Sequence, residues 1–228
     1  MSQKRIGVVL SGCGYLDGAE IHESVLTLLA LDRAGVEAVC MAPDRNQTDV
    51  IDHRTHESAR QTRNVLAESA RIARGKIQNI RDVDLGTLDA IILPGGFGAA
   101  KNLCSFATDG PECSVDEDVA RALRSVHAAG KPIAALCIAP AILAALFGAE
   151  LNPSLTIGTD PGTAAALEKM GARHRTAGVN EAVVDADNRL VTTPCYMSAT
   201  RVSEVAEGAA AAVRELLKLV EQTAATTA

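Results

Sequence analysis

Short, unbroken apolar runs alternate along this chain with longer segments in which apolar residues recur at helical spacing. The runs are bounded by Gly, Pro or charged residues, and several have no polar position to face solvent. This pattern is typical of parallel strands that are covered on both faces. Five such strands are predicted, over residues 6–10, 36–41, 88–93, 133–136 and 155–159.

The segments between the runs predict helices, and alternation of strands and helices indicates a parallel sheet with helices on both sides. In the first helix the apolar period is carried by Ile21, Val25, Leu28 and Leu29. The helices are predicted over residues 20–34, 58–74, 116–129, from 140 onward, 161–171 and 198–221.

Near the C-terminal end, two strand-like runs flank Asp187-Asn188, which predicts a small β-hairpin over residues 181–193. No linker divides the chain. We therefore expect a single three-layer α/β domain over residues 1–228, with a mostly parallel sheet and a tail that frays from about residue 222.

Composition narrows the function classes. The 228 residues are 47% hydrophobic but only 2% aromatic, and the net charge is −6 without a basic stripe, which argues against nucleic-acid binding. The six cysteines form no C-x-x-C pair, so zinc and thioredoxin-type sites find no support. No apolar run is long enough for a membrane span, and the first strand begins too early for a signal peptide, so a cytoplasmic protein is expected.

Two further motifs give only weak signals for a ligand site. Gly12-x-Gly14-x-x-x-Gly18 begins like a dinucleotide fingerprint but lacks the spacing of its third glycine. His53 and His56 lie three residues apart in a polar segment, but no third metal ligand is near them. We expect no metal and no cofactor.

The strongest chemical signal is Cys137, which lies where the predicted strand 133–136 ends and a helix begins. Pro140 suits the first turn of that helix, because its missing N–H is not needed there. Free N–H groups at a helix start stabilise a thiolate, so a lowered thiol pKa is expected. The alternative is a small, buried, inert cysteine.

Three segments are expected to meet Cys137 at the carboxyl edge of the sheet: the loop 11–18, the turn 94–98 and the start of the first helix. The Ile138 N–H and a glycine N–H from the turn could form an oxyanion hole. Glu23, in the first turns of the helix, could donate a hydrogen bond to the thiolate and shuttle a proton if burial raised its pKa. His22 points about 100° away from Glu23 on the helix.

These motifs resemble the ThiJ/PfpI superfamily, which is related to class I glutamine amidotransferases, and within it the ElbB-type isoprenoid biosynthesis glyoxalase branch. The similar stretches begin at Leu10, Asp17, Pro94, Cys137, Leu155 and Val191, and so extend over most of the chain.

The resemblance implies a flavodoxin-like fold, Cys137 as nucleophile, Glu23 as its partner carboxyl, and Gly96 and Ile138 as the oxyanion hole. Gly95, His22, Cys13 and Asp160 are expected to support the site. It further implies a weak, cofactor-independent glyoxalase that converts glyoxal to glycolate, and a homodimer.

One departure from the superfamily bears on the reaction. Many members have a His soon after the cysteine turn, whereas the matching region here reads Thr159-Asp160. Amidase or protease chemistry needs such a base and is therefore disfavoured. Two alternatives stay open beside a glyoxalase that acts on small aldehydes: a redox or stress-response protein with an oxidisable Cys137, and an amidotransferase-like hydrolase.

Overall fold

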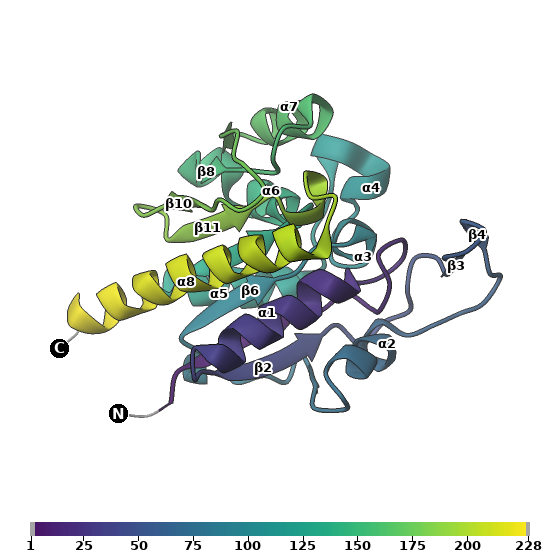
Figure 1. The fold of residues 1–228 in the computed structure, drawn as a ribbon, viewed down its shortest axis with the longest axis horizontal. Helices are drawn as coiled ribbons and strands as arrows, with labels where there is room; N and C mark the ends of the chain where they lie inside the picture. Colours follow the sequence, from purple (N-terminus) through teal and green to yellow (C-terminus); the bar gives the residue numbers. More distant parts are fainter. Residues whose placement is uncertain (1–2, 227–228) are drawn as a thin grey trace.

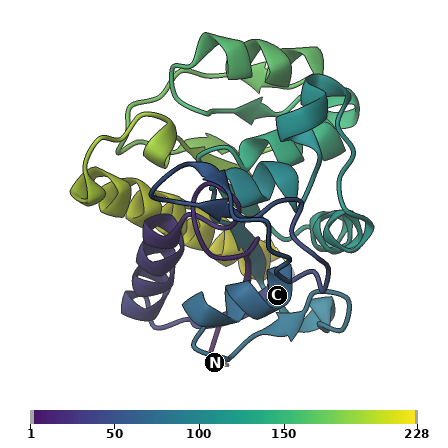
Figure 2. The same cartoon turned by 90° about the vertical axis from the view of Figure 1, so that its right-hand side faces the viewer.

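The computed structural model describes residues 3–226 and is built on a seven-stranded sheet with helices on both faces (Figures 1 and 2). The predicted α/β architecture is confirmed. In spatial order the strands are β10 (Val183–Asp185), β11 (Leu190–Thr193), β7 (Ile133–Leu136), β6 (Ala90–Leu93), β1 (Arg5–Val9), β2 (Glu37–Ala42) and β5 (Gln78–Asn79).

All neighbouring strands in this sheet are parallel except the hairpin pair β10 and β11. The predicted hairpin is therefore confirmed, and its second strand joins the sheet beside β7. β6 and β7 are fully buried, as expected for central strands whose residues are all apolar. The carboxyl ends of β1, β6, β7 and β11 consequently lie at one edge of the sheet.

Two layers of helices cover the sheet. One hydrophobic cluster joins residues of β1, β6 and β7 to α1 and α8, and the other joins the opposite face of these strands to α5 and α6. α1 and α8 lie side by side across one face (Figure 1). The helices are α1 (Ile21–Arg33), α2 (Val65–Ile72), α3 (Phe97–Lys101), α4 (Phe106–Asp109), α5 (Glu117–Ala128), α6 (Pro140–Leu151), α7 (Pro161–Lys169) and α8 (Val202–Thr226).

The first helix forms where it was expected, but of the four apolar residues that predicted it only Leu28 packs against the core. Ile21, Val25 and Leu29 are 43%, 48% and 38% exposed, whereas Glu23, Ser24, Thr27 and Leu31 are buried. Leu29 lies in a groove between α1 and α8. The helix is rotated in this way because Glu23 is held by backbone groups beneath it, as described below.

Three predicted elements differ from the structure. The segment 155–159 contributes only Leu155 to a strand, β8 (Ser154–Leu155), which pairs with β9 (Arg173–His174) outside the central sheet. Its chain turns away at Gly158, where φ is +90°.

The helix predicted over 58–74 begins only at Val65, where the Asn64 side chain accepts the Ala67 N–H. Ahead of it lies a short hairpin of β3 (Ile51–Asp52) and β4 (Glu57–Ser58). The helix predicted over 198–221 starts at Val202 and continues to Thr226, and residues 227–228 of the tail lie outside the described residues. Short 3₁₀ turns occur at Leu85–Thr87, Gly110–Glu112 and Cys195–Met197.

Candidate functional site

Cys137 occupies a sharp turn between β7 and α6. Its φ of +59° lies in the left-handed region, which is strained for a residue other than glycine. The Cys137 N–H donates to the Thr193 carbonyl at 3.0 Å, so β11 holds the turn in place. The thiol is buried and accepts hydrogen bonds from the Gly96 and Ile138 N–H groups. The predicted strand-to-helix cysteine and both predicted amides therefore come together.

The glycine turn after β6 approaches Cys137 so closely that no side chain would fit. A Cβ on Gly95 would lie 2.4 Å from the Cys137 Cβ, and one on Gly96 would lie 2.4 Å from the Glu20 nitrogen. Gly96 also has a φ of +95°, which favours glycine. These glycines bring the backbone amides of the turn to the sulfur and the carboxyl.

Glu23 is fully buried beside Cys137, and both of its carboxyl oxygens accept backbone hydrogen bonds. Oε2 accepts the Gly95 N–H at 2.8 Å and Oε1 accepts the Tyr196 N–H at 3.1 Å. The Cys137 thiol is hydrogen-bonded to the same carboxyl. The Gly95 amide thus binds the Glu23 carboxyl, whereas the Gly96 amide binds the Cys137 sulfur.

The two groups have unusual acidities. Burial raises the pKa of Glu23 to about 7, although the amides of Tyr196 and Gly95 and the Cys137 thiol act in the opposite direction. Burial also raises the pKa of Cys137 well above its ordinary value, and the charge of Glu23 adds to the effect, although the Gly96 and Ile138 amides lower it.

The expected lowered thiol pKa is therefore wrong, because desolvation outweighs the amides. Since three donors point at the Glu23 carboxyl, the geometry favours a thiol that donates to a carboxylate at rest. A carboxyl with a pKa near neutrality is well matched to accept a proton and return it.

The predicted supporting residues divide into two groups. His22 lines the pocket above Cys137, and its Nδ1 lies 2.8 Å from the Tyr196 hydroxyl. Asp160 instead caps α7 by accepting the Thr163 N–H. It does not line the pocket, whereas Thr163 does. Cys13 is not among the residues that line the pocket either. It is half-buried, and the charged groups that act on it are Glu68, Arg71, Asp17 and Arg63.

The pocket over Cys137 has a volume of about 730 Å³ and is mainly apolar. Its walls come from the loop before α1, the starts of α3 and α6, α4, α7 and the turn at Tyr196. The lining residues are Tyr15, Glu20, His22, Gly96, Phe97, Ala100, Phe106, Ala107, Cys137, Ile138, Thr163, Tyr196 and Met197.

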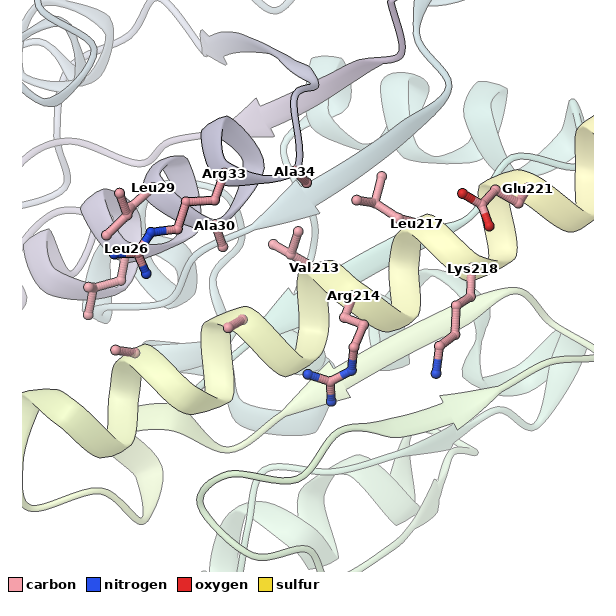
Figure 3. A pocket seen from close by; sticks show the side chains of 12 residues that line it. Leu26, Leu29, Ala30, Arg33, Ala34, Val213, Arg214, Leu217, Lys218 and Glu221 are labelled. Atoms are coloured by element: carbon pink, nitrogen blue, oxygen red, sulfur yellow. The ribbon is translucent and has the colours of Figure 1, made fainter.

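A second hollow, of about 400 Å³, lies between α1 and α8 (Figure 3). Leu26, Leu29, Val213 and Leu217 line it together with charged side chains such as Arg214. It contains no cysteine, histidine or buried carboxyl, and therefore offers no chemistry comparable to that of the Cys137 pocket.

Other chemistries find little support. Within residues 3–226, no group of three or more His, Cys, Asp or Glu side chains could hold a metal ion. His53 instead positions its own loop: its Nε2 accepts the Leu16 N–H at 3.3 Å and its ring packs edge-on against Tyr15. No helix of the described chain is long and apolar enough to cross a membrane.

Two residues of the site were missed in the sequence. Tyr196 supplies an amide to Glu23, and Glu20 caps α1 by accepting the Glu23 N–H at 2.7 Å. Glu20 lies within the motif that begins at Asp17, and Tyr196 follows the motif that begins at Val191, so motif proximity was a usable signal. The bond from the Tyr196 amide to Glu23 could not be read from spacing, because the two residues are 173 positions apart.

Comparison with known proteins shows two mitochondrial relatives that match most of the chain. The chain is 46% identical over 226 residues to the rat "ES1 protein homolog, mitochondrial", which covers 94% of this chain and 84% of that protein. It is equally similar to the human "Glutamine amidotransferase-like class 1 domain-containing protein 3, mitochondrial", with 94% and 83% covered.

Among solved structures, an isoprenoid biosynthesis protein with an amidotransferase-like domain from Ehrlichia chaffeensis matches with a TM-score of 0.89 and 36% identity, covering 95% of this chain and 99% of that one. Glyoxalase III from Candida albicans shares the fold, with a TM-score of 0.61 over 96% of each chain, at only 16% identity.

These relatives correct one expectation. Three curated relatives, from rat, human and zebrafish, are named as mitochondrial proteins, which contradicts the predicted cytoplasmic location. The family itself was correctly anticipated. The model of the DJ-1/PfpI family matches residues 14–199, a span that contains Glu23, the glycine turn, Cys137 and Tyr196, and the chain belongs to this family.

Proposed function

We propose that this protein is a cofactor-independent glyoxalase that converts 2-oxoaldehydes, glyoxal among them, to 2-hydroxy acids. The observation that carries the proposal is the contact between a buried thiol and a buried carboxyl of near-neutral pKa, with the Gly96 and Ile138 amides at the sulfur. The reaction needs these three parts: a nucleophile, a proton carrier and an oxyanion hole.

The reaction starts at the aldehyde carbon. As the Cys137 sulfur forms a bond to this carbon, its proton passes to Glu23 and then to the aldehyde oxygen, which gives a hemithioacetal. The amides of Gly96 and Ile138 stabilise the negative charge that develops on that oxygen. Because Glu23 accepts the thiol proton during attack, no free thiolate has to exist in the resting site.

Glu23 then moves a second proton. Its carboxylate removes the hydrogen of the former aldehyde carbon and returns a proton to the neighbouring carbon, while the hydroxyl proton of the first carbon passes to the oxygen of the second. The product is a thioester of a 2-hydroxy acid. Water cleaves its C–S bond and returns a proton to sulfur, so the net reaction is the addition of water to the 2-oxoaldehyde, and no external oxidant or reductant is required.

The test is consumption of glyoxal and methylglyoxal by purified protein without glutathione or added metal. We expect turnover by the wild type and a loss of at least about 100-fold in Cys137→Ala and Glu23→Gln, since both groups act in the bond-making steps. Turnover that survives Cys137→Ala would refute the proposal.

The alternative of a redox sensor is favoured by the position of Cys137 in the lining of this pocket, where a small oxidant could contact the sulfur. It predicts no aldehyde turnover and stoichiometric oxidation of Cys137 by mild peroxide, measured as a mass increase. An amidotransferase-like hydrolase would instead release ammonia from glutamine. The homodimer is likewise a proposal, and light scattering of the purified protein would test it.

A further inference from the structure

The chain uses its aromatic residues in an unusual place. It has three Phe, two Tyr and no Trp in 228 residues. Four of these five side chains, Tyr15, Phe97, Phe106 and Tyr196, line the pocket over Cys137, and only Phe147 lies elsewhere. Aromatic rings bury large areas and normally contribute strongly to a hydrophobic core. In this protein Ala, Val, Leu and Ile fill the core, and the rings surround the reactive thiol.

These rings are available to a ligand and are held in place. Phe97 is 48% and Tyr15 is 41% exposed. The Phe97 N–H donates to the Tyr15 carbonyl at 2.7 Å, and the Tyr15 ring packs edge-on against His53 with a centroid distance of 5.4 Å. Exposed apolar rings that are fixed by backbone and ring contacts mark a binding surface rather than incidental exposure.

The size of the pocket points the same way. At about 730 Å³ it falls within the range of pockets that enclose drug-sized molecules. A two-carbon dialdehyde could contact Cys137 and its amides but would leave Phe97 and Phe106 in water. The aromatic walls would then contribute nothing to binding.

The charges of the pocket limit the ligand further. Among the lining residues that the structure describes there is no Lys or Arg, and Glu20 adds a carboxyl. The nearby Lys101 ammonium lies 5.6 Å from the Phe97 ring centre but is paired with Asp49 at 2.8 Å and hydrogen-bonded to the Leu16 carbonyl. A phosphate, a carboxylate or a glutathione adduct would therefore find no Lys or Arg partner among these lining residues.

We propose that the pocket selects 2-oxoaldehydes whose second carbon carries a large uncharged apolar group, either aryl or medium-length alkyl, which lies between Phe97 and Phe106 while the aldehyde reaches Cys137. This inference rests on the proposed function, and it narrows the substrate class beyond glyoxal. The chemistry at sulfur is the same for every member of the class, so binding of the apolar group decides the preference.

The main experiment is a chain-length series. Rates of 2-hydroxy acid formation are measured by chromatography for methylglyoxal, 2-oxobutanal, 2-oxohexanal, 2-oxooctanal and phenylglyoxal. Product is quantified because phenylglyoxal also reacts with arginine. We expect kcat/KM to rise about fourfold for each methylene that the walls bury. Phe97→Ala and Phe106→Ala should flatten this rise, whereas Leu29→Ala, an exposed apolar residue in the other groove, should reproduce the wild-type series.

The outcomes separate the two proposals. If Cys137-dependent turnover exists but kcat/KM is flat or falls beyond methylglyoxal, the substrate class is wrong and the glyoxalase function stands. If no aldehyde of the series is turned over, the proposed glyoxalase function is wrong. The binding experiment below then tests separately whether the pocket prefers apolar ligands.

Binding is measurable without chemistry because both tyrosines line the pocket and the chain has no Trp. Tyrosine fluorescence of Cys137→Ala is titrated with acetophenone, an unreactive aryl ketone. Saturable quenching that Phe97→Ala weakens at least about fivefold would support the apolar ligand class. Quenching that does not saturate, or that is the same in Phe97→Ala, would overturn it.

Discussion

The buried carboxyl of Glu23 should make the protein less stable as the pH rises, and Glu23→Gln should remove this dependence. The pKa of this group is 4.5 when unperturbed and about 7 in the folded protein. Between these pH values the carboxyl keeps its proton in the folded state but has released it in the unfolded state. Ionisation therefore stabilises the unfolded state and lowers the free energy of unfolding. The stability that Glu23 contributes is therefore greatest at low pH, and it is lost as the pH rises from 4.5 to about 7.

The magnitude follows from the difference of about 2.5 pH units, at about 1.4 kcal/mol for each unit. The full penalty is about 3 kcal/mol, and most of it develops between pH 5 and pH 8. Because the group is fully buried, solvent does not screen it. The Cys137 thiol does not add to this dependence, since its pKa lies above the window.

The assay is urea denaturation of wild type and Glu23→Gln at several pH values from 5 to 8. A glutamine must turn its NH₂ toward either the Gly95 or the Tyr196 N–H, which lowers the stability of the variant by an amount that does not depend on pH. The decisive quantity is therefore how the difference in unfolding free energy between Glu23→Gln and wild type changes with pH. We expect this difference to move by about 2 to 3 kcal/mol in favour of the variant from pH 5 to pH 8.

Glu221→Gln is the matched control, because Glu221 is an exposed carboxyl that forms a surface ion pair with Lys4. Its difference from wild type should be nearly constant over the same range. A Glu23→Gln difference that is equally constant would show that the buried carboxyl has an ordinary acidity, and the proton-carrier role assigned to it would lose its physical basis.

Three further outcomes are expected. In a pH profile, kcat/KM should rise through a pKa of about 7 as Glu23 becomes a carboxylate, and a profile flat from pH 5 to 8 would contradict its role as base. Gly95→Ala should lower kcat/KM by at least about 100-fold, because the new methyl would overlap Cys137, whereas Gly162→Ala, whose methyl meets nothing closer than 3.6 Å, should retain wild-type rates. Tyr196→Phe keeps the amide that holds Glu23, so a loss above about tenfold would show that the hydroxyl itself takes part.

The sequence by itself determined most strands of the central sheet and the place of Cys137 at the end of one of them. Four of the five predicted apolar runs form strands of the central sheet, and the hairpin at Asp187-Asn188 was equally local. Cys137 was identified in the same way, since the strand before it and Pro140 after it define a turn over a few residues. Such signals survive folding because they depend on neighbours in the chain.

Tertiary structure decided which face of α1 is buried and what Glu23 does. Ile21, Val25 and Leu29 have the right period for a core face, yet the face with Glu23 packs inward. The partners that hold Glu23 are Gly95 and Tyr196, which are 72 and 173 residues away. No local pattern encodes such contacts.

The same reasoning explains the error in acidity. The start of α6 does provide an amide to Cys137, as the sequence indicated, and this amide lowers the thiol pKa. Burial and the adjacent Glu23 act in the opposite direction and are stronger. Whether a cysteine at a helix start rests as thiol or thiolate depends on how many layers cover it, and that is set by strands and helices that meet only in the folded chain.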